Sequence, residues 1–432
     1  MAYMEITTLY QCFLECTGIS TDTRKIQPGS MFVALKGDNF DANTFAAEAL
    51  AKGAKYVVID NPAYQQGNAT LLVNNCLTAL QDLARHHRRQ LGLPVIGLTG
   101  SNGKTTTKEL INAVLSQKYN TTATTGNLNN HIGVPLTLLS FSTETEIGIV
   151  EMGANHQLEI ELLCNIAEPN FGYITNFGKA HLEGFGGFEG VIKGKSELYN
   201  YLKNNTKTAF VNLDDRIQAE KTATLPRYTF ATESYEGNVR LQNIEANPMV
   251  NLIYNDLHIQ SNLIGSYNAA NISAAIAIGH YFKVPDNQIK AAIEGYIPTN
   301  NRSQLMELNG NKIILDAYNA NPSSMAAAIA NFQQLDSQHK IAILGDMFEL
   351  GPESLEEHRK VVDLLTDQDA ITAHFVGKYF YYNKVDRHNL HFHDSFESLK
   401  NYLSDKKFNQ NTILIKGSRG MALERSLEFI NS

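Results

Sequence analysis

The chain has 432 residues, which at about 150 residues per domain predicts two or three domains. Its formal net charge of −8 argues against a protein that coats nucleic acid or an anionic membrane. Hydrophobic residues make up 43% of the chain and charged residues 19%, a composition typical of globular rather than disordered proteins.

The cellular compartment is indicated by the cysteines and by the lack of a long apolar stretch or a signal peptide. The four cysteines contain no C-x-x-C pair, so they resemble neither a disulfide framework nor a zinc knuckle, and they fit a reducing environment. No stretch approaches 18 unbroken apolar residues, and the N-terminus has neither the basic region nor the apolar run of a signal peptide. We therefore expect a soluble cytoplasmic protein.

The first block, residues 1–93, mixes short β-like runs with helical stretches and predicts a small α/β module. A basic helical stretch, Leu77–Gln90, ends at Gly92 and Pro94, which interrupt a helix and predict a linker. The other expected elements are the strands Met31–Leu35, Tyr56–Ile59 and Thr70–Val73 and a helix near Thr44–Ala51.

In the second block, residues 94–301, apolar strands alternate with helices, which predicts a parallel sheet covered on both faces. Near residue 230 the pattern changes to hairpin-like segments, and a long apolar helix follows. The expected strands are Val95–Thr99, Ile147–Glu151, Tyr173–Asn176 and Ala209–Leu213, and the hairpin segments are Val239–Ile244 and Leu252–Ile259. The expected helices are Thr106–Gln117, His156–Ile166, Val191–Leu202 and Ala269–Phe282.

The third block, residues 302–432, repeats the α/β alternation and predicts a Rossmann-like domain that ends in a helix near Met421–Ile430. Its expected strands are Lys312–Ala317, Lys340–Leu344, Ala373–Val376 and Thr412–Ile415. The fold class is thus α/β, with three domains.

The strongest chemical signal is Thr99–Thr107 (TGSNGKTTT), between a predicted strand and a predicted helix. In such a phosphate loop, glycines let backbone N–H groups surround a phosphate, while Lys104 supplies charge and Thr105 can hold Mg²⁺. The strict pattern has a glycine where this chain has Leu98, and Gly97 lies one residue early. A glycine turn with an exposed lysine is the alternative, which the strand–loop–helix context disfavours. The loop residues expected at the nucleotide are Gly100, Ser101, Asn102, Gly103, Lys104, Thr105 and Thr106.

Other polar residues follow predicted strands, but each alone has an ordinary explanation. Glu151 ends an apolar strand in the same sheet, where an acid is placed to hold Mg²⁺ or to lie in solvent. His181 follows another strand, and Lys193 and Lys195 lie on the next helix, where a lysine usually faces water. The loop Thr125–Asn130 can bind a polar substrate or simply turn the chain. The residues alone therefore indicate a Mg²⁺-nucleotide enzyme and no more.

Short motifs occur in a fixed order from end to end of the chain. They are Thr21–Arg24 (TDTR), Gly29–Gly37 (GSMFVALKG), Thr99–Thr107, Gly126–Leu139 (GNLNNHIGVPLTLL), Glu151–His156 (EMGANH), Ile174–Glu183, Ser266–Asn271, Arg302, Asp316–Met325 (DAYNANPSSM), Leu344–Gly351 (LGDMFELG) and Lys416–Met421 (KGSRGM). Together they resemble the Mur ligase family, and within it the members that add a dipeptide. Asp41-Ala42-Asn43 departs from the family's usual Asp-Gly-His, which affects a UDP contact. The chain has no Asp-Asn-Pro-Arg string, which is typical of the members that add the third amino acid.

The resemblance implies an ATP-dependent ligase with two Mg²⁺ ions. ATP would phosphorylate the carboxylate of UDP-N-acetylmuramoyl-tripeptide to an acyl phosphate, and the amine of D-alanyl-D-alanine would then displace the phosphate. Residues 1–93 would bind the UDP-sugar, residues 94–301 ATP, and residues 302–432 the dipeptide and part of ATP. The third peptide residue, lysine or diaminopimelate, stays open. A monomer is expected, with no nucleic-acid partner and no membrane insertion.

The resemblance also implies residue roles. Lys104 would contact the β- and γ-phosphates, with Thr105 and Glu151 at one Mg²⁺ and His181 at the second. A carbamate on Lys195, or on its rival Lys193, would offer Mg²⁺ two oxygen donors. The residues implied at the adenine, phosphate and ribose are Asn268, Asn271, Arg302 and Asp316. Those implied at the UDP-sugar peptide are Thr23, Arg24, Asn129 and Asn130, and those at the peptide and dipeptide end are Asp346, Lys416, Ser418 and Arg419.

Three alternatives compete with this interpretation. A folylpolyglutamate synthase would share the phosphate loop but should lack the UDP-binding first block. A nucleotide-switch or motor ATPase would leave the amide-rich loop and Asp316–Met325 unexplained. A binding module without catalysis is disfavoured by the joint presence of Lys104, Glu151, His181 and Lys195.

Overall fold

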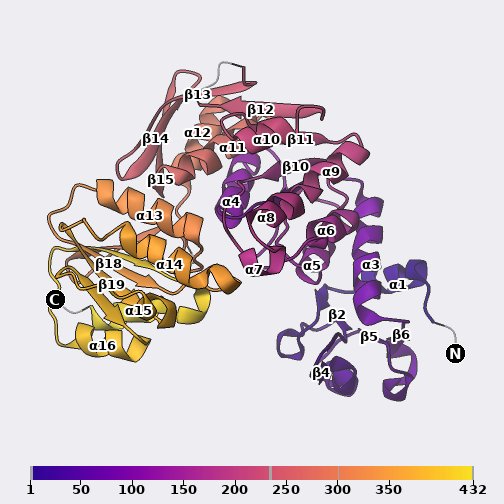
Figure 1. Cartoon of the computed structure of the whole chain (residues 1–432). Helices are drawn as coiled ribbons and strands as arrows, with labels where there is room; N and C mark the ends of the chain where they lie inside the picture. Colours follow the sequence, from indigo (N-terminus) through magenta and orange to yellow (C-terminus); the bar gives the residue numbers. More distant parts are fainter. Residues whose placement is uncertain (1–2, 233–235, 300, 431–432) are drawn as a thin grey trace.

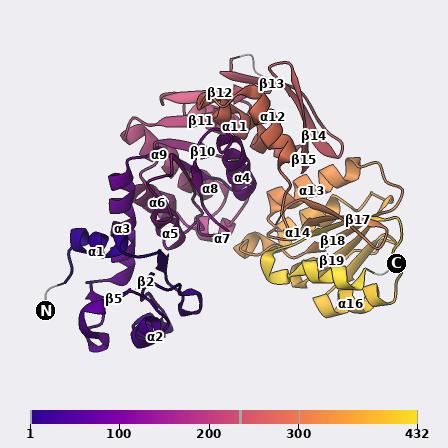
Figure 2. The ribbon, with the colours of Figure 1, turned by 180° about the vertical axis from the view of Figure 1, so that it is seen from behind.

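The computed structural model describes residues 3–232, 236–299 and 301–430. Three sheets organise the described chain into three lobes, which we define as residues 6–91 (N-terminal), 95–295 (central) and 304–429 (C-terminal). Figures 1 and 2 show the N-terminal lobe, in indigo, and the C-terminal lobe, in orange and yellow, on opposite sides of the central lobe. The predicted α/β class is confirmed.

The N-terminal lobe has a parallel sheet in the order β1-β2-β5-β6 and a small antiparallel pair, β3 and β4. Helix α3 begins at Cys76, because Asn75 caps it, and ends at Leu91, where Gly92 adopts a left-handed φ of 64°. It packs against α1 and also against α5 and α6, so it joins this lobe to the central one. The elements are α1 (Ile6–Leu14), β1 (Ile19–Ser20), β2 (Met31–Val33), β3 (Lys36–Gly37), β4 (Phe40–Asp41), α2 (Ala46–Ala51), β5 (Tyr56–Ile59), β6 (Thr70–Leu72) and α3 (Cys76–Leu91), with short 3₁₀ turns at Thr23–Lys25, Ala42–Phe45, Pro62–Tyr64 and Gly67–Ala69.

The central sheet has nine strands in the order β15-β14-β13-β12-β11-β10-β7-β9-β8. Strands β7 to β12 are parallel, and β13, β14 and β15 form an antiparallel meander. The strands are β7 (Val95–Thr99), β8 (Thr121–Ala123), β9 (Ile147–Glu151), β10 (Phe171–Ile174), β11 (Thr208–Asn212), β12 (Arg227–Ala231), β13 (Val239–Ala246), β14 (Met249–Tyr254) and β15 (Leu257–Ile264).

Alternate residues of the buried central strands enter two different cores, as expected for a sheet covered on both faces. Ile96 packs with the residues of α4, α11 and α12, whereas Val95 packs with those of α3, α5 and α6. The helices are α4 (Lys104–Leu115), α5 (Gly133–Leu139), α6 (Glu159–Ala167), α7 (Leu182–Phe185), α8 (Phe188–Lys195), α9 (Glu197–Asn204), α10 (Arg216–Lys221), α11 (Tyr267–Tyr281) and α12 (Asp286–Gly295).

The C-terminal lobe has six strands in the order β16-β17-β21-β18-β19-β20, all parallel except the edge strand β16. The elements are β16 (Gln304–Leu308), β17 (Asn311–Asp316), α13 (Pro322–Gln334), β18 (Lys340–Gly345), η5 (Gly351–Glu353), α14 (Ser354–Asp363), β19 (Ile371–Val376), α15 (Lys378–Tyr382), β20 (Leu390–His393), α16 (Phe396–Ser404), β21 (Thr412–Lys416), η6 (Arg419–Met421) and η7 (Leu423–Phe429).

Two element predictions need correction, and the second hairpin prediction is confirmed. The predicted helix Val191–Leu202 is two helices, because α8 ends at Lys195 and α9 begins at Glu197, with Ser196 between them. The hairpin segment Leu252–Ile259 spans the turn between the antiparallel strands β14 and β15, where Asn255 and Asp256 both have positive φ. The last predicted helix, Met421–Ile430, consists of short 3₁₀ turns, interrupted where Ala422 adopts a left-handed φ of 48°.

The strand order places the phosphate loop at a reversal of the chain. From β7 the chain moves to β8 and β9 on one side, and then crosses to β10 on the other. Ligands of open α/β sheets bind in the crevice beyond the carboxyl ends of strands at such a point. In the described part of the chain, no helix has both the length and the apolar character needed to cross a membrane.

Candidate functional site

The phosphate loop (Thr99–Thr107) connects β7 to α4, as predicted. Gly100 has a φ of 142°, and a Cβ atom there would lie 2.0 Å from Thr175 Oγ1, so only glycine fits. The residues that follow β10 hold the loop in place. Thr175 Oγ1 donates to Asn102 O at 2.6 Å, and Ser101 Oγ donates to Gly178 O at 2.8 Å. These bonds hold the loop in an open curve at the start of the helix, the arrangement that binds anions.

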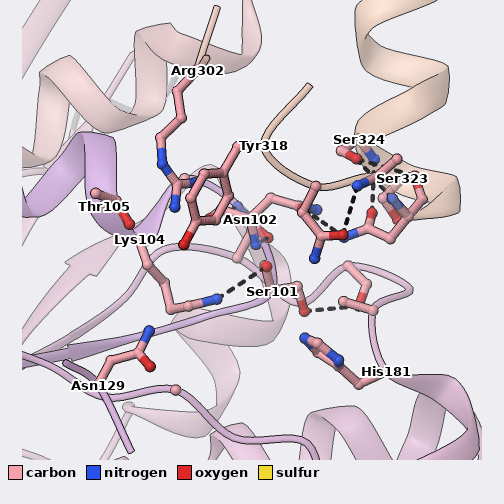
Figure 3. A pocket seen from close by; sticks show the side chains of 18 of the residues that line it. Ser101, Asn102, Lys104, Thr105, Asn129, His181, Arg302, Tyr318, Ser323 and Ser324 are labelled. Carbon is pink, nitrogen blue, oxygen red and sulfur yellow. Dashed lines mark hydrogen bonds between the residues drawn. The ribbon is translucent and has the colours of Figure 1, made fainter. Parts of the chain in front are cut away.

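Lys104 begins α4 and folds back over the phosphate loop (Figure 3). Its Nζ donates to Gly100 O at 2.8 Å and to Ser101 O at 3.2 Å. Burial lowers the pKa of Lys104, Glu151 opposes this shift and the positive charge of Arg302 adds to it. Two cations thus face one space, which is suited to a polyanion such as a nucleotide phosphate chain.

Glu151, the last residue of β9, is the best candidate Mg²⁺ ligand. Its side chain is buried, Oε1 accepts a 2.8 Å hydrogen bond from Asn129 Nδ2, and Oε2 has no partner. A buried carboxylate oxygen without a partner is costly unless a cation binds it. The described residues contain no cluster of three or more metal-ligating side chains. Mg²⁺ usually takes one or two carboxylates and fills its other positions with water and phosphate, so the Oε2 atom of Glu151 beside the phosphate loop could serve as one ligand.

Lys195 is buried behind the cavity wall at Ala154, and Lys193 is not. Lys195 is 0% exposed, and its Nζ donates to Ala154 O at 3.0 Å and lies 4.9 Å from the centre of the Phe185 ring. Burial, and then the charge of Lys104, lower the pKa of Lys195 well below its ordinary value. Lys193 is exposed, so only Lys195 points into the protein.

On the opposite side of the cavity, Arg302, just before β16, and residues of the C-terminal lobe form a cationic and aromatic group. The guanidinium carbon of Arg302 lies 3.5 Å from the centre of the Tyr318 ring, and that of Arg419 lies 5.2 Å from it. Asp316 and Lys416 end the paired strands β17 and β21 and form a 2.6 Å ion pair. The predicted ribose residue and a predicted dipeptide residue therefore touch each other.

The C-terminal lobe contacts the phosphate loop and the loop after β10 directly. Asn321 Nδ2 donates to Asn102 Oδ1 at 2.7 Å, and Lys179 N donates to Ser323 Oγ at 2.8 Å. Two side-chain pairs also cross this junction: Lys179 with Glu357 at 2.8 Å, and His181 with Glu349. The lobes together enclose a cavity of about 980 Å³, at the upper end of the size of ligand pockets.

Most of the predicted site residues line this one cavity. They are Ser101, Asn102, Gly103, Lys104, Thr105, Thr106, Asn129, Asn130, Glu151, His181, Asn268, Asn271, Arg302, Asp316, Lys416, Ser418 and Arg419. Segments more than 300 residues apart in the sequence thus meet in one cavity. The order of the motifs along the chain did not by itself predict this proximity.

Four predicted residues besides Gly100 do not line the cavity, and their positions explain why. Thr23 and Arg24 lie in the N-terminal lobe, where Arg24 pairs with the neighbouring Asp22. Asp346 accepts 3.0 Å hydrogen bonds from two backbone N–H groups at the start of α15, so it serves as a helix cap. Lys195 lies one layer behind the wall residue Ala154.

The two asparagines predicted at the adenine form a chain of hydrogen bonds. Asn271 donates to Asn268 Oδ1 at 2.8 Å and accepts from Thr107 Oγ1 at 3.0 Å. Asn268 donates to Ile264 O at 2.8 Å. These bonds join helix α11 to the phosphate loop, and both asparagines line the cavity although they are largely buried.

Sequence reasoning missed several residues at the lobe junction. They are Lys179, Tyr318, Asn321, Ser323, Glu349 and Glu357. All of them except Glu357 lie inside the motifs given above, so their proximity in sequence to the predicted residues was the available signal.

Comparisons with known proteins agree with this architecture. Family models described as Mur ligase family, catalytic domain, Mur ligase middle domain, and Mur ligase, glutamate ligase domain match residues 15–88, 98–279 and 301–419. The UDP-N-acetylmuramoyl-tripeptide–D-alanyl-D-alanine ligase of Bacillus subtilis (strain 168) is 35% identical over 94% of this chain and 91% of its own length. The ligase of the same name from Escherichia coli (strain K12) is 34% identical over 94% and 92%.

Solved structures give the same result. A crystal structure of MurF from Acinetobacter baumannii superposes with a TM-score of 0.86 at 30% identity, covering 99% of each chain. MurF ligase from Thermotoga maritima in complex with ADP superposes with a TM-score of 0.84 at 27% identity, covering 96% of this chain and 97% of that one. On the sequence matches over nearly its whole length, this chain belongs to the Mur ligase family.

Proposed function

We propose that this chain is an ATP-dependent ligase that adds D-alanyl-D-alanine to UDP-N-acetylmuramoyl-tripeptide through an acyl phosphate, in peptidoglycan precursor synthesis. The observation that carries the proposal is one cavity lined by the phosphate loop, by Glu151, whose Oε2 has no hydrogen-bond partner, and by the cations Arg302, Lys416 and Arg419. Relatives that share more than 90% of their length with this chain bear the name of this activity, and the T. maritima relative binds ADP.

In the first step, a carboxylate oxygen of the tripeptide attacks the γ-phosphorus of ATP and ADP leaves. Lys104 would exchange its backbone carbonyl partners for phosphate oxygens, and Arg302 would add a second positive charge. Thr105 and Glu151 would hold Mg²⁺, which supplies charge neutralisation on the phosphates. Catalysis in this step comes from position and charge, so no nucleophilic side chain is needed.

In the second step, the amine of the dipeptide attacks the acyl carbon and a tetrahedral intermediate forms. The C–N bond forms, the bond from carbon to the phosphate oxygen breaks, and the amine loses a proton. We assign Lys416, Ser418 and Arg419 to the peptide and dipeptide end, where all three line the cavity. Asp346 does not line the cavity. It would act indirectly, by capping α15 and so supporting the loops at the strand ends.

We assign the three predicted domains to the three substrates. Residues 1–93 would bind the UDP-sugar through the region of Thr23 and Arg24, and Asn129 and Asn130 would hold the attached peptide. Residues 94–301 would bind ATP, with Asn268 and Asn271 near the adenine. Residues 302–432 would bind the dipeptide and, through Arg302 and Asp316, the phosphates and ribose.

A carbamate on Lys195 belongs to the proposal. Addition of CO₂ requires a neutral amine, and the buried position of Lys195 favours that form. The amine nitrogen would bond to the CO₂ carbon and lose a proton, and the resulting anion would offer oxygen donors to a second Mg²⁺ that His181 also serves.

The proposal also includes a cytoplasmic monomer. Four free thiols, two of them buried, fit a reducing compartment. Both substrates would have to be delivered there in soluble form.

The direct test measures phosphate release with ATP, UDP-N-acetylmuramoyl-tripeptide and D-alanyl-D-alanine, omitting each in turn. The expected result is release only when all three are present, with one amide bond formed per phosphate by mass spectrometry. Rapid ATP hydrolysis without either acceptor would instead indicate an ATPase. Turnover with a folate and glutamate in place of these substrates would indicate the other ligase class.

A further inference from the structure

One pair of side chains joins the loop after β10 to the loop after β18. His181 Nδ1 contacts Glu349 Oε2, and both residues line the cavity. His181 comes from the central lobe and Glu349 from the C-terminal lobe, so the pair exists only where these lobes meet. The second ring nitrogen of His181, Nε2, makes no hydrogen bond to the described residues.

The backbone around the pair is unusual on both sides. His181 has a φ of 54° and Glu349 a φ of 62°, a left-handed conformation that costs free energy for residues other than glycine. The two loops interlock, since Glu183 N donates to Glu349 O at 3.3 Å and a Cβ on Gly351 would lie 3.1 Å from Glu183 Cβ. Strained residues persist where surrounding contacts determine them, and they gather at functional sites.

We propose that Glu349 is a positioning residue that accepts the Nδ1–H of His181 and so directs Nε2 toward the metal beside the acyl phosphate. Histidines that bind metals almost always donate their other ring N–H to a carboxylate or carbonyl, which sets the tautomer and the ring orientation. This inference rests on the proposed function, because it assigns a partner to the proposed ligand His181.

The position of Glu349 adds a consequence for the order of events. Because the carboxylate comes from the other lobe, His181 has this partner only while the C-terminal lobe contacts the central one. The second metal site is therefore complete only when the two lobes are in contact. The same contact would help to exclude water, which would otherwise hydrolyse an acyl phosphate.

A second pair across the same junction provides the matched control. Lys179 Nζ lies 2.8 Å from Glu357 Oε1, and Glu357 also pairs with Lys360 at 3.0 Å. This pair joins the same two lobes but does not touch His181. A residue that only helps the lobes dock should therefore behave like Glu357, whereas a positioning residue should affect the metal.

The experiment compares wild type with Glu349→Ala, Glu349→Gln and Glu357→Gln. Bound Mn²⁺ is counted by electron paramagnetic resonance while each protein holds a non-hydrolysable ATP analogue and UDP-N-acetylmuramoyl-tripeptide. Wild type should bind two ions. Glu349→Ala should retain the first and bind the second about 10–100-fold more weakly, the usual effect of losing such a carboxylate partner. Its kcat should fall while the KM for ATP stays near wild type.

Two variants make the result decisive. Glu349→Gln keeps an oxygen that accepts the Nδ1–H and should recover part of the second-site affinity, and thermal unfolding checks that every variant is folded. Glu357→Gln should keep both sites. Unchanged second-site affinity in Glu349→Ala, an equal loss in Glu357→Gln, or a ligating wild type with one bound ion would overturn the proposal. A wild type that fails to ligate at all would instead refute the proposed function.

Discussion

The two faces of the cavity are built in different ways. On the central side, one strand, one loop and one helix supply the anion site, and Lys104 makes its hydrogen bonds within four residues of its own position. On the C-terminal side, the charged groups come from strand ends and connections that lie about a hundred residues apart, such as Asp316 and Lys416. Lys104 therefore finds its partners locally, although Thr175 and Gly178 hold the loop itself. The opposite face depends on strand pairing and on contact between the lobes.

This difference separates two kinds of mutational effect. Changes in the phosphate loop should remove chemistry and leave the rest of the molecule intact. Changes on the C-terminal face should alter binding or stability by smaller amounts, because several groups share each task there.

Lys104→Ala should lower the rate of ligation by roughly two or more orders of magnitude, because it removes a charge directed at the transferring phosphoryl group. The unfolding temperature should hardly change, since the ammonium group bonds only to loop carbonyls. Steady-state kinetics and thermal unfolding test this. Near-normal turnover in the variant would remove the phosphate-loop assignment.

Lys195→Ala should also lower ligation, by about two orders of magnitude, and short carboxylates added to the solution should restore part of the activity. Lys193→Ala is the matched control, because that side chain is exposed and should be dispensable. Mass spectrometry of the native protein under CO₂ should show an addition at Lys195. Full activity of Lys195→Ala would contradict the carbamate.

Acid should destabilise the C-terminal lobe before it affects the phosphate loop. Burial lowers the pKa of His374 to about 3 and that of His393 to about 4, and the charges of neighbouring histidines add to the shift. The unfolded histidines take up protons near pH 6.5, so stability is complete above that pH and is lost as the pH falls toward 4. Between pH 7 and pH 5 the loss should be about 1–2 kcal/mol per histidine.

Hydrogen exchange at pH 7 and pH 5 tests this prediction, with increased exchange expected at β19 (Ile371–Val376) and β20 (Leu390–His393). His374 Nδ1 lies 3.1 Å from His393 Nε2, and His391 stacks on His374 with ring centres 4.9 Å apart. His374→Phe should reduce the pH dependence. If protection from hydrogen exchange fell equally in β7 and β19, the histidines of β19 and β20 would not be the cause.

Tyr318→Ala should raise the KM for ATP by about threefold to tenfold, because the ring holds the guanidinium of Arg302 at 3.5 Å and such stacking contributes about 1 kcal/mol. Tyr318→Phe keeps the ring and should stay near wild type. Equilibrium binding of ADP provides a second measure. If the phenylalanine variant loses as much affinity as the alanine variant, the hydroxyl group, and not the stacking, is responsible.

The elements that the sequence predicted well are those whose determinants are local. Strands β7 and β9 were found with the bounds of the prediction, because an unbroken apolar run between turns identifies a strand buried on both faces. The break at Ser196 and the 3₁₀ turns at the C-terminus were missed, since apolar spacing does not distinguish one helix from two short ones.

By itself, the sequence determined the α/β class and the phosphate loop, because glycines and a lysine between a strand and a helix form a pattern within a few positions. Most of the other residues at the candidate site were predicted from the resemblance to the Mur ligase family. Only the tertiary structure decided that Lys195 and not Lys193 points inward, that Asp316 pairs with Lys416, and that Asp346 caps a helix. The contact of His181 with Glu349 was likewise decided only by the tertiary structure. Such facts depend on strand register and on the contact between lobes, which join side chains far apart in the chain and leave no local pattern.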